Sequence, residues 1–134
     1  MLLALFDAGH VHHTRAKSWL VSQTNPRWAT CPLTENGFVR IISQPSYPGA
    51  ISVSRAIALL KHASSTEFHE FWADDLSILD EQLFDRRRVV GPKQVTDIYL
   101  LALAVKKGGC LVALDRAISL TAVLSAEPHH LIVL

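Results

Sequence analysis

Residues 93–115 read KQVTDIYLLALAVKKGGCLVALD, and this stretch predicts a helix followed by a buried strand. Residues 99–105 form an apolar run of good helix formers. Thr96 can cap the start of this helix. That would place Asp97 in the first turn, where unpaired N–H groups and the helix dipole favour a carboxylate. Two lysines followed by Gly108 and Gly109 are typical of a helix end.

Residues 110–114 form a short apolar run with no polar interruption, which is typical of a strand buried on both faces, as parallel strands are. Asp115 stands where this strand stops. In an open α/β sheet, ligands bind beyond the carboxyl ends of the strands. A helix that runs back into a strand starts at the sheet edge where that strand ends. We therefore expect Asp97 and Asp115 to be near neighbours.

The length of 134 residues fits a single domain, residues 1–134, and a hydrophobic content of 49% with 19% charged residues is enough for one core. The net charge of +1 neither favours nor excludes a nucleic-acid partner. No apolar run approaches the roughly 20 residues needed to cross a bilayer, and the short apolar start lacks the basic residues of a signal peptide. We therefore expect a cytoplasmic protein without a membrane partner. Cys31 and Cys110 are expected to be buried thiols in strand regions rather than a disulfide.

Helices and short strands alternate along the rest of the chain, and no internal repeat or domain boundary is visible. The expected helices cover residues 10–20, 33–43, 52–63, 76–84 and 117–124, and the expected strands cover residues 27–31, 68–72 and 131–134. This alternation predicts an α/β sandwich around a mostly parallel sheet.

A third acid occupies a position like that of Asp97, because Glu35 lies in the first turn of a helix that follows a strand. Glu35, Asp97 and Asp115 are thus expected at the carboxyl edge of one sheet. Like charges crowded in a partly dry cleft repel, so such a cluster needs a cation. Carboxylate oxygens without paired His or Cys suit Mg²⁺ or Mn²⁺ rather than zinc. The alternative is that each acid only caps a helix or meets a lysine.

Four stretches then carry a family resemblance. They are ATCPLTENGFVR at residues 29–40, FWADDLS at residues 71–77, VTDIYLLALA at residues 95–104 and GCLVALDRA at residues 109–117. In this order and spacing the sequence resembles the PIN-domain ribonucleases, in particular the VapC-type toxins of toxin–antitoxin pairs. The resemblance covers nearly the whole chain.

The resemblance implies a PIN-like α/β/α sandwich with a mostly parallel sheet. It also implies a metal-dependent endoribonuclease, in which an acid cluster holds Mg²⁺ and a water attacks the RNA phosphodiester. Glu35, Asp97 and Asp115 match acids of the family and are the candidate catalytic and metal-binding residues. The implied partners are an RNA substrate, a VapB-like antitoxin that fills the acidic cleft, and a second copy of the chain in a homodimer.

One departure from the family pattern lies at the amino-terminal end. The family opens with a strand that carries an Asp, and here that Asp would lie about two residues before Met1. Either the natural chain is longer, so that residues 1–134 are an N-terminally truncated PIN-like domain, or the chain is a degenerate copy. If it begins at Met1, we expect weak Mg²⁺ binding and little nuclease activity. The competing functions are then a non-catalytic module that binds antitoxin or RNA, and an unrelated Mg²⁺ phosphohydrolase.

The basic residues Arg86, Arg87 and Arg88, with Lys93, form the single basic cluster of the sequence. Such residues can contact RNA phosphates beside the acids. A solvated loop explains them equally well.

Overall fold

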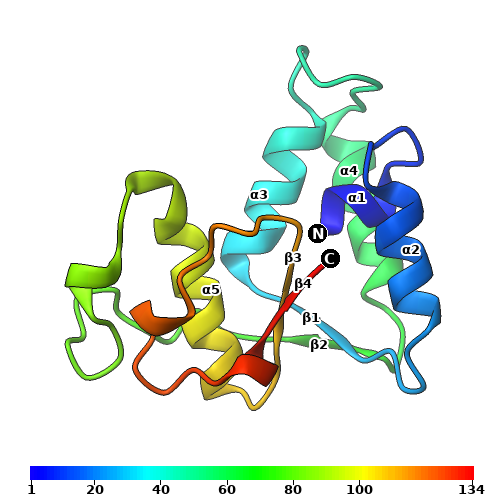
Figure 1. The fold of residues 1–134 in the computed structure, drawn as a ribbon. Coiled ribbons are helices and arrows are strands. Elements are labelled where there is room, and N and C mark those ends of the chain that lie inside the picture. The colour runs from blue at the N-terminus through cyan, green and yellow to red at the C-terminus, as the bar shows by residue number, and fades with distance from the viewer. The chain divides into compact units, whose positions relative to one another are not determined.

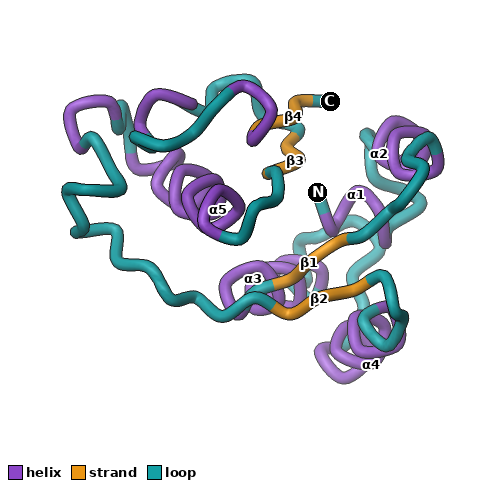
Figure 2. Tube along the Cα trace, turned by 90° about the horizontal axis from the view of Figure 1, so that it is seen from below, coloured by secondary structure: helices purple, strands orange, loops and turns teal.

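The computed structural model describes all residues, Met1–Leu134, and the chain divides into two compact units, Met1–Asp74 and Asp75–Leu134. Each unit has its own helices and its own pair of parallel strands (Figures 1 and 2). Each unit also has its own hydrophobic core. The expected α/β class with parallel strands is therefore confirmed. The expected single domain and the layering of one continuous sandwich stay predictions.

The first unit is mostly helical around two short strands. Its elements are α1 (Leu2–Phe6), α2 (His13–Val21), β1 (Trp28–Thr30), α3 (Pro32–Ile42), α4 (Val53–Ala63) and β2 (His69–Phe71). Strands β1 and β2 pair in parallel, with Trp28 opposite His69 and Thr30 opposite Phe71. In Figure 2 the two strands run side by side, close to the label of α3. This register matters below, because Trp28 and Thr30 lie on the same face of β1, so the side chain of His69, opposite Trp28, can reach the side chain of Thr30.

Apolar residues of α3 and α4 form the core of the first unit. Phe38 and Ile42 of α3 are buried with Ala56 and Leu60 of α4, at the helical spacing that gives each helix one apolar face. The ring of Phe6 in α1 meets the ring of Phe38 edge to face, with centroids 5.5 Å apart. These contacts fix the buried face of α3, and they thereby fix the direction in which the side chains on its remaining faces point.

The second unit is built around one long helix. Its elements are η1 (Arg86–Arg88), η2 (Pro92–Gln94), α5 (Val95–Lys106), β3 (Leu111–Ala113), η3 (Leu120–Ala122), η4 (Pro128–His130) and β4 (Leu131–Val133). Strands β3 and β4 pair in parallel, with Leu111 opposite Leu131 and Ala113 opposite Val133. Ile98 and Leu101 of α5 are fully buried, and Phe84 and Val123 pack in the same cluster. The apolar run of α5 is thus the centre of this core.

The start of α5 differs from the expected one. Pro92 opens the 3-10 turn η2, and α5 follows directly from Val95, so Thr96 lies inside the helix and is not its cap. Proline at the first position of a helical turn fixes φ and lacks only an N–H that would be unpaired there. Asp97 nevertheless remains in the first turn of α5.

Two expected helices are not formed. Residues 76–84 make turns, in which Ser77 and Asp80 accept hydrogen bonds from the backbone N–H groups two residues further on, at 3.2 and 2.9 Å. Such local bonds compete with the helical backbone pattern. Residues 117–124 form only the 3-10 turn η3. The expectation of a helix was wrong for both segments.

The two cysteines also differ from expectation. Cys31 is buried but caps the start of α3 instead of lying in β1, and Cys110 is exposed just before β3. Both are free thiols, as expected. None of the helices has the length and the apolar character needed to cross a membrane.

Candidate functional site

Two of the candidate acids meet in the second unit. Asp97 lies in the first turn of α5, and Asp115 lies just beyond the end of β3. The chain turns between these elements at Gly108, whose φ of 69° is easily reached only by glycine. Asp97 is half-buried and Asp115 is exposed. Burial, and next the negative charge of Asp115, raise the pKa of Asp97. The two carboxylates are therefore close enough to repel each other.

The loop after β3 holds Asp115 in place through its own backbone. Asp115 Oδ1 accepts a hydrogen bond from the N–H of Ala117 at 2.8 Å. The carbonyl of Ala117 in turn accepts a hydrogen bond from the side chain of Gln94, the residue just before α5. This pair of bonds ties the loop that carries one acid to the start of the helix that carries the other.

The donor set of this pair fits a hard divalent cation. The negative charge of Asp115 raises the pKa of Asp97, and a cation bound beside both carboxylates removes that repulsion. Within either unit no three His, Cys, Asp or Glu side chains gather into a metal-binding group. Mg²⁺ is commonly held by one or two carboxylates and keeps several waters. Asp97 and Asp115 could therefore supply the protein ligands of such an ion.

Glu35 belongs to the first unit and has a different environment. It is half-buried in the first turn of α3, and its Oε1 accepts a hydrogen bond of 2.7 Å from the hydroxyl of Thr30. Thr30 is only 2% exposed, and its oxygen also lies 2.9 Å from Nε2 of His69. In this unit the carboxylate of Glu35 thus meets a hydroxyl donor rather than a second acid.

The start of α3 is fixed by several side chains. Asp74 Oδ2 accepts a hydrogen bond from the N–H of Leu33 at 3.0 Å, which satisfies one of the free donors at the start of the helix. Thr34 Oγ1 accepts from the N–H of Cys31 at 2.9 Å. Pro32 occupies the first helical position. Glu35 is therefore carried by a helix end that has little freedom to move.

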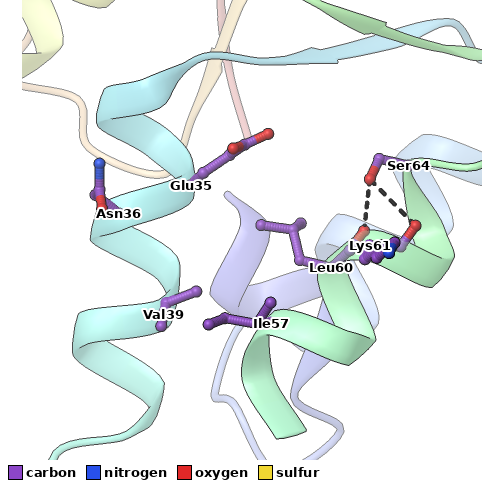
Figure 3. Close-up of a pocket in the computed structure, with 7 residues that line it drawn as sticks. All are labelled: Glu35, Asn36, Val39, Ile57, Leu60, Lys61 and Ser64. Atoms are coloured by element: carbon purple, nitrogen blue, oxygen red, sulfur yellow. Dashed lines mark hydrogen bonds between the residues drawn. The ribbon is translucent and has the colours of Figure 1, made fainter. Parts of the chain in front are cut away.

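A cavity of about 380 Å³ lies between α3 and α4, and Glu35 is at its edge. Figure 3 shows Glu35 and Val39 projecting from α3 toward Ile57 and Leu60 on α4. The cavity is lined by Glu35, Asn36, Val39, Ile57, Leu60, Lys61 and Ser64. The candidate catalytic residue Glu35 and Lys61 thus border this cavity, together with the apolar side chains of Val39, Ile57 and Leu60.

Sequence reasoning missed the polar residues that support Glu35. Thr30 offered one signal, since it is a polar residue near the end of an expected strand, directly before the thiol of Cys31 that was expected to be buried. Asp74 lies in the stretch of residues 71–77 that carries the resemblance, which marked it only in that way. His69 offered no signal, because its contact depends on how distant parts of the chain pair.

The basic cluster is partly engaged within its own loop. Nε atoms of Arg87 and Arg88 lie 3.0 and 3.3 Å from the carboxylate of Asp85, and the hydrogen bond from Arg87 is the main cause that lowers the pKa of Asp85. Arg86 lies 3.6 Å from Glu81 and is largely exposed. Lys93 is exposed on η2. Arg86 and Lys93 are thus the members with most freedom to meet a phosphate.

Comparison with known proteins places the chain in a family. It is 54% identical over 131 residues to Ribonuclease VapC44 of Mycobacterium tuberculosis, with 98% of this chain and 92% of the relative covered. The chain belongs to the VapC family of ribonucleases. Ribonuclease VapC38 of the same species is 41% identical over 118 residues, covering 87% of this chain and 82% of the relative. Ribonuclease VapC39 is 40% identical over 121 residues, covering 89% and 86%. No family model matches the sequence.

The VapC relationship confirms the resemblance on which the sequence interpretation rests, and with it the class of ribonuclease toxins. It also favours the nuclease interpretation over an unrelated phosphohydrolase. The VapC relatives do not by themselves assign roles to Glu35, Asp97 or Asp115. Those roles rest on the geometry of the residues and on the motifs that carry them.

Proposed function

We propose that this VapC-family chain is a Mg²⁺- or Mn²⁺-dependent endoribonuclease that hydrolyses RNA phosphodiesters. The observation that carries the proposal is the pair formed by Asp97 and Asp115, in which burial and a neighbouring charge raise the pKa of Asp97. Acids with perturbed pKa values cluster at functional sites, so Asp97 is a candidate functional residue on physical grounds. Glu35 is the third catalytic acid of the proposal, on the strength of its family motif and its fixed position.

The proposed site has acids that bind the metal ion and basic residues that bind the RNA. Asp97 and Asp115 would hold the divalent ion, with Glu35 as the further acid of the site. When bound, the ion makes a water more acidic and neutralises charge that develops on the phosphoryl group. In the metal-free protein, burial and the charge of Asp115 disfavour the ionised form of Asp97 and so raise its pKa. A bound cation would remove the repulsion between the two carboxylates. Arg86 and Lys93 would contact phosphates of the RNA, since basic side chains supply most of such contacts.

The proposed partners follow from the family. A VapB-like antitoxin would bind the toxin and cover its acids, and two copies of the chain would form a homodimer. We propose the cytoplasm as the place of action, because the RNA substrate of the proposal is found there. Size-exclusion chromatography with light scattering on the isolated chain tests the dimer directly, and a monomer at micromolar concentration would reject it.

The nuclease is tested by incubating the chain with structured RNA, with and without Mg²⁺. We expect cleavage that requires the metal, at a low rate if the first acid of the family pattern is missing. The rate should fall about a further 100-fold in Asp97→Asn and Asp115→Asn, the usual cost of removing a group that stabilises developing charge. Glu70→Gln is the matched control, because Glu70 is an exposed acid on β2 outside the proposed site. It should cleave at the wild-type rate.

Three outcomes would change the conclusion. Retained cleavage in Asp97→Asn would remove Asp97 from the mechanism. RNA or antitoxin binding without any cleavage would identify a non-catalytic module. Hydrolysis of small phosphate esters with no effect on RNA would instead favour the phosphohydrolase.

A further inference from the structure

A hydrogen-bonded chain of three side chains runs through the first unit from His69 to Glu35. Thr30 is its centre, with Oγ1 at 2.7 Å from Glu35 Oε1 and at 2.9 Å from His69 Nε2. Thr30 is 2% exposed, so water cannot readily take the place of either partner. Both contacts have the lengths of ordinary to strong hydrogen bonds.

The number of available protons determines which atom donates and which accepts in each of these two hydrogen bonds. A hydroxyl has a single proton to donate, and an ionised carboxylate can only accept. The Thr30 proton must therefore point at Glu35, and the contact with His69 is left for the lone pair of Thr30. His69 Nε2 must then carry a hydrogen and act as the donor. The order is Nε2–H of His69 to Oγ1 of Thr30, and O–H of Thr30 to Oε1 of Glu35.

The imidazole ring is held in place by the strand pairing. His69 opens β2 and lies opposite Trp28 of β1 in the parallel register. The centroids of the two rings are 4.5 Å apart. Helix α3 starts directly after Cys31, so Glu35 lies one turn beyond the strand that carries Thr30. The sheet thus fixes the donor, and the helix fixes the acceptor.

We propose that Thr30 and His69 are positioning residues for Glu35, which they hold in one rotamer by a hydrogen bond to Oε1 that leaves Oε2 for a metal ion or its water. This inference rests on the proposed function, in which Glu35 is an acid of a metal site. Residues behind a ligand commonly change metal affinity by 10-fold to 100-fold. Thr30 is one such residue, and His69 acts through it.

The direction of the chain is tested first, in metal-free protein, by ¹H–¹⁵N NMR of the histidine side chains. We expect neutral His69 as the Nε2–H tautomer, with an Nε2 proton that is protected from solvent exchange. This proton should be lost to rapid exchange in Thr30→Val, which keeps the shape of the side chain and the β-branch that suits a strand. An Nδ1–H tautomer in the wild type would overturn the proposal, because Thr30 would then donate to His69.

The effect on the site is tested with Mn²⁺ alone, by calorimetric titration. We expect Thr30→Val to bind Mn²⁺ about tenfold more weakly, and Thr30→Ser, which keeps the hydroxyl, to stay close to the wild type. His69→Phe keeps a ring against Trp28 and removes the donor, so it provides a second route if Thr30→Val does not fold. It should weaken Mn²⁺ binding as well, while His69→Gln, which restores an N–H donor, should recover it.

The controls separate this inference from the proposed function. Thr66→Val alters an exposed threonine before β2 and should bind Mn²⁺ as the wild type does. Wild-type affinity in Thr30→Val and His69→Phe would overturn the positioning role and leave the nuclease proposal standing. If the wild type bound no Mn²⁺, the proposed function would fail and the positioning role with it, whatever tautomer His69 adopts.

Discussion

Asp97→Asn is expected to stabilise the metal-free protein and to abolish its stabilisation by Mg²⁺. Burial and the charge of Asp115 both raise the pKa of Asp97. A carboxyl whose pKa is raised by folding binds its proton more tightly in the folded state, so its stabilising contribution is present at low pH and is lost as the pH rises through the folded pKa. At neutral pH the ionised Asp97 therefore destabilises the fold, and an uncharged Asn removes that cost.

The part of the effect that comes from the charge of Asp115 sets a lower bound, and its size follows from the exposure of Asp115. Two unit charges about 4 Å apart in water interact by about 1 kcal/mol. Asp115 is exposed, so water and salt screen the repulsion, and we expect the variant to gain about 0.5 kcal/mol. For a chain of 134 residues about 1 kcal/mol moves the melting temperature by about 4 °C. Metal-free Asp97→Asn should thus melt about 2 °C above the wild type.

Mg²⁺ should reverse this order. A ligand that binds only the folded state, at ten times its dissociation constant, stabilises it by about 1.4 kcal/mol. The wild type should then gain about 6 °C, and Asp97→Asn, which lacks half of the acid pair, should gain almost nothing. The melting curves of the two proteins are therefore expected to exchange places when the metal is added.

Thermal melting followed by circular dichroism, at neutral pH and constant ionic strength, measures all four states. Asp75→Asn is the matched control, because Asp75 lies 3.1 Å from Lys106 and 3.4 Å from Lys107. The hydrogen bond from Lys106 is the main cause that lowers the pKa of Asp75, so its loss should lower metal-free stability and leave the gain from Mg²⁺ intact. A metal-free Asp97→Asn that melts below the wild type, or keeps the full Mg²⁺ shift, would refute the reasoning.

Three further changes test other parts of the molecule. Leu101→Ala should lower the free energy of unfolding by about 3 kcal/mol in urea titrations, because Leu101 is fully buried in α5. Tyr47→Phe removes the hydrogen bond of 2.8 Å from the Tyr47 hydroxyl to Asp7, which is the main cause that lowers the pKa of Asp7. This bond stabilises the folded state above the ordinary pKa of Asp, and the stabilisation is lost as the pH falls through the lowered pKa of Asp7. The variant should therefore unfold more easily at neutral pH, with a difference that closes in acid. Arg86→Gln should reduce the salt dependence of RNA binding by about one phosphate contact, and Arg87→Gln by less, because Arg87 is paired inside its loop. An equal effect of both arginines would contradict this order.

The long helices of this fold could be predicted from the sequence, because several local signals agree there. Helix α4 has a periodic apolar face, and Ser52 accepts a hydrogen bond from the N–H of Arg55 at its start. Helix α3 begins at a proline, as predicted. The segments predicted wrongly, residues 76–84 and 117–124, are short. In the first of them, side chains bond to the nearby backbone and favour turns.

The surroundings of the acids could be predicted from the sequence only where consecutive elements of the chain bring the residues together. The proximity of Asp97 and Asp115 follows from one helix running back into one strand, which the sequence displays directly. The contact of Thr30 with His69 joins residues 39 positions apart, and it exists because β1 and β2 pair in one register. A shift of that register by one residue would turn His69 to the other face of the pair. No local pattern encodes such a pairing, so this support of Glu35 became visible only in the structure.

Glu35 and Asp97 occupy equivalent places, each in the first turn of a helix that carries a family motif. Their nearest polar neighbours are nevertheless of different kinds. Thr30 gives Glu35 a donor, whereas Asp115 gives Asp97 a second negative charge. A cation therefore relieves the repulsion between Asp97 and Asp115, whereas Glu35 already has the hydroxyl of Thr30 as a partner. Metal affinity should accordingly fall further in Asp97→Asn than in Glu35→Gln, and a larger loss in Glu35→Gln would mean that the ion is held mainly by the first unit.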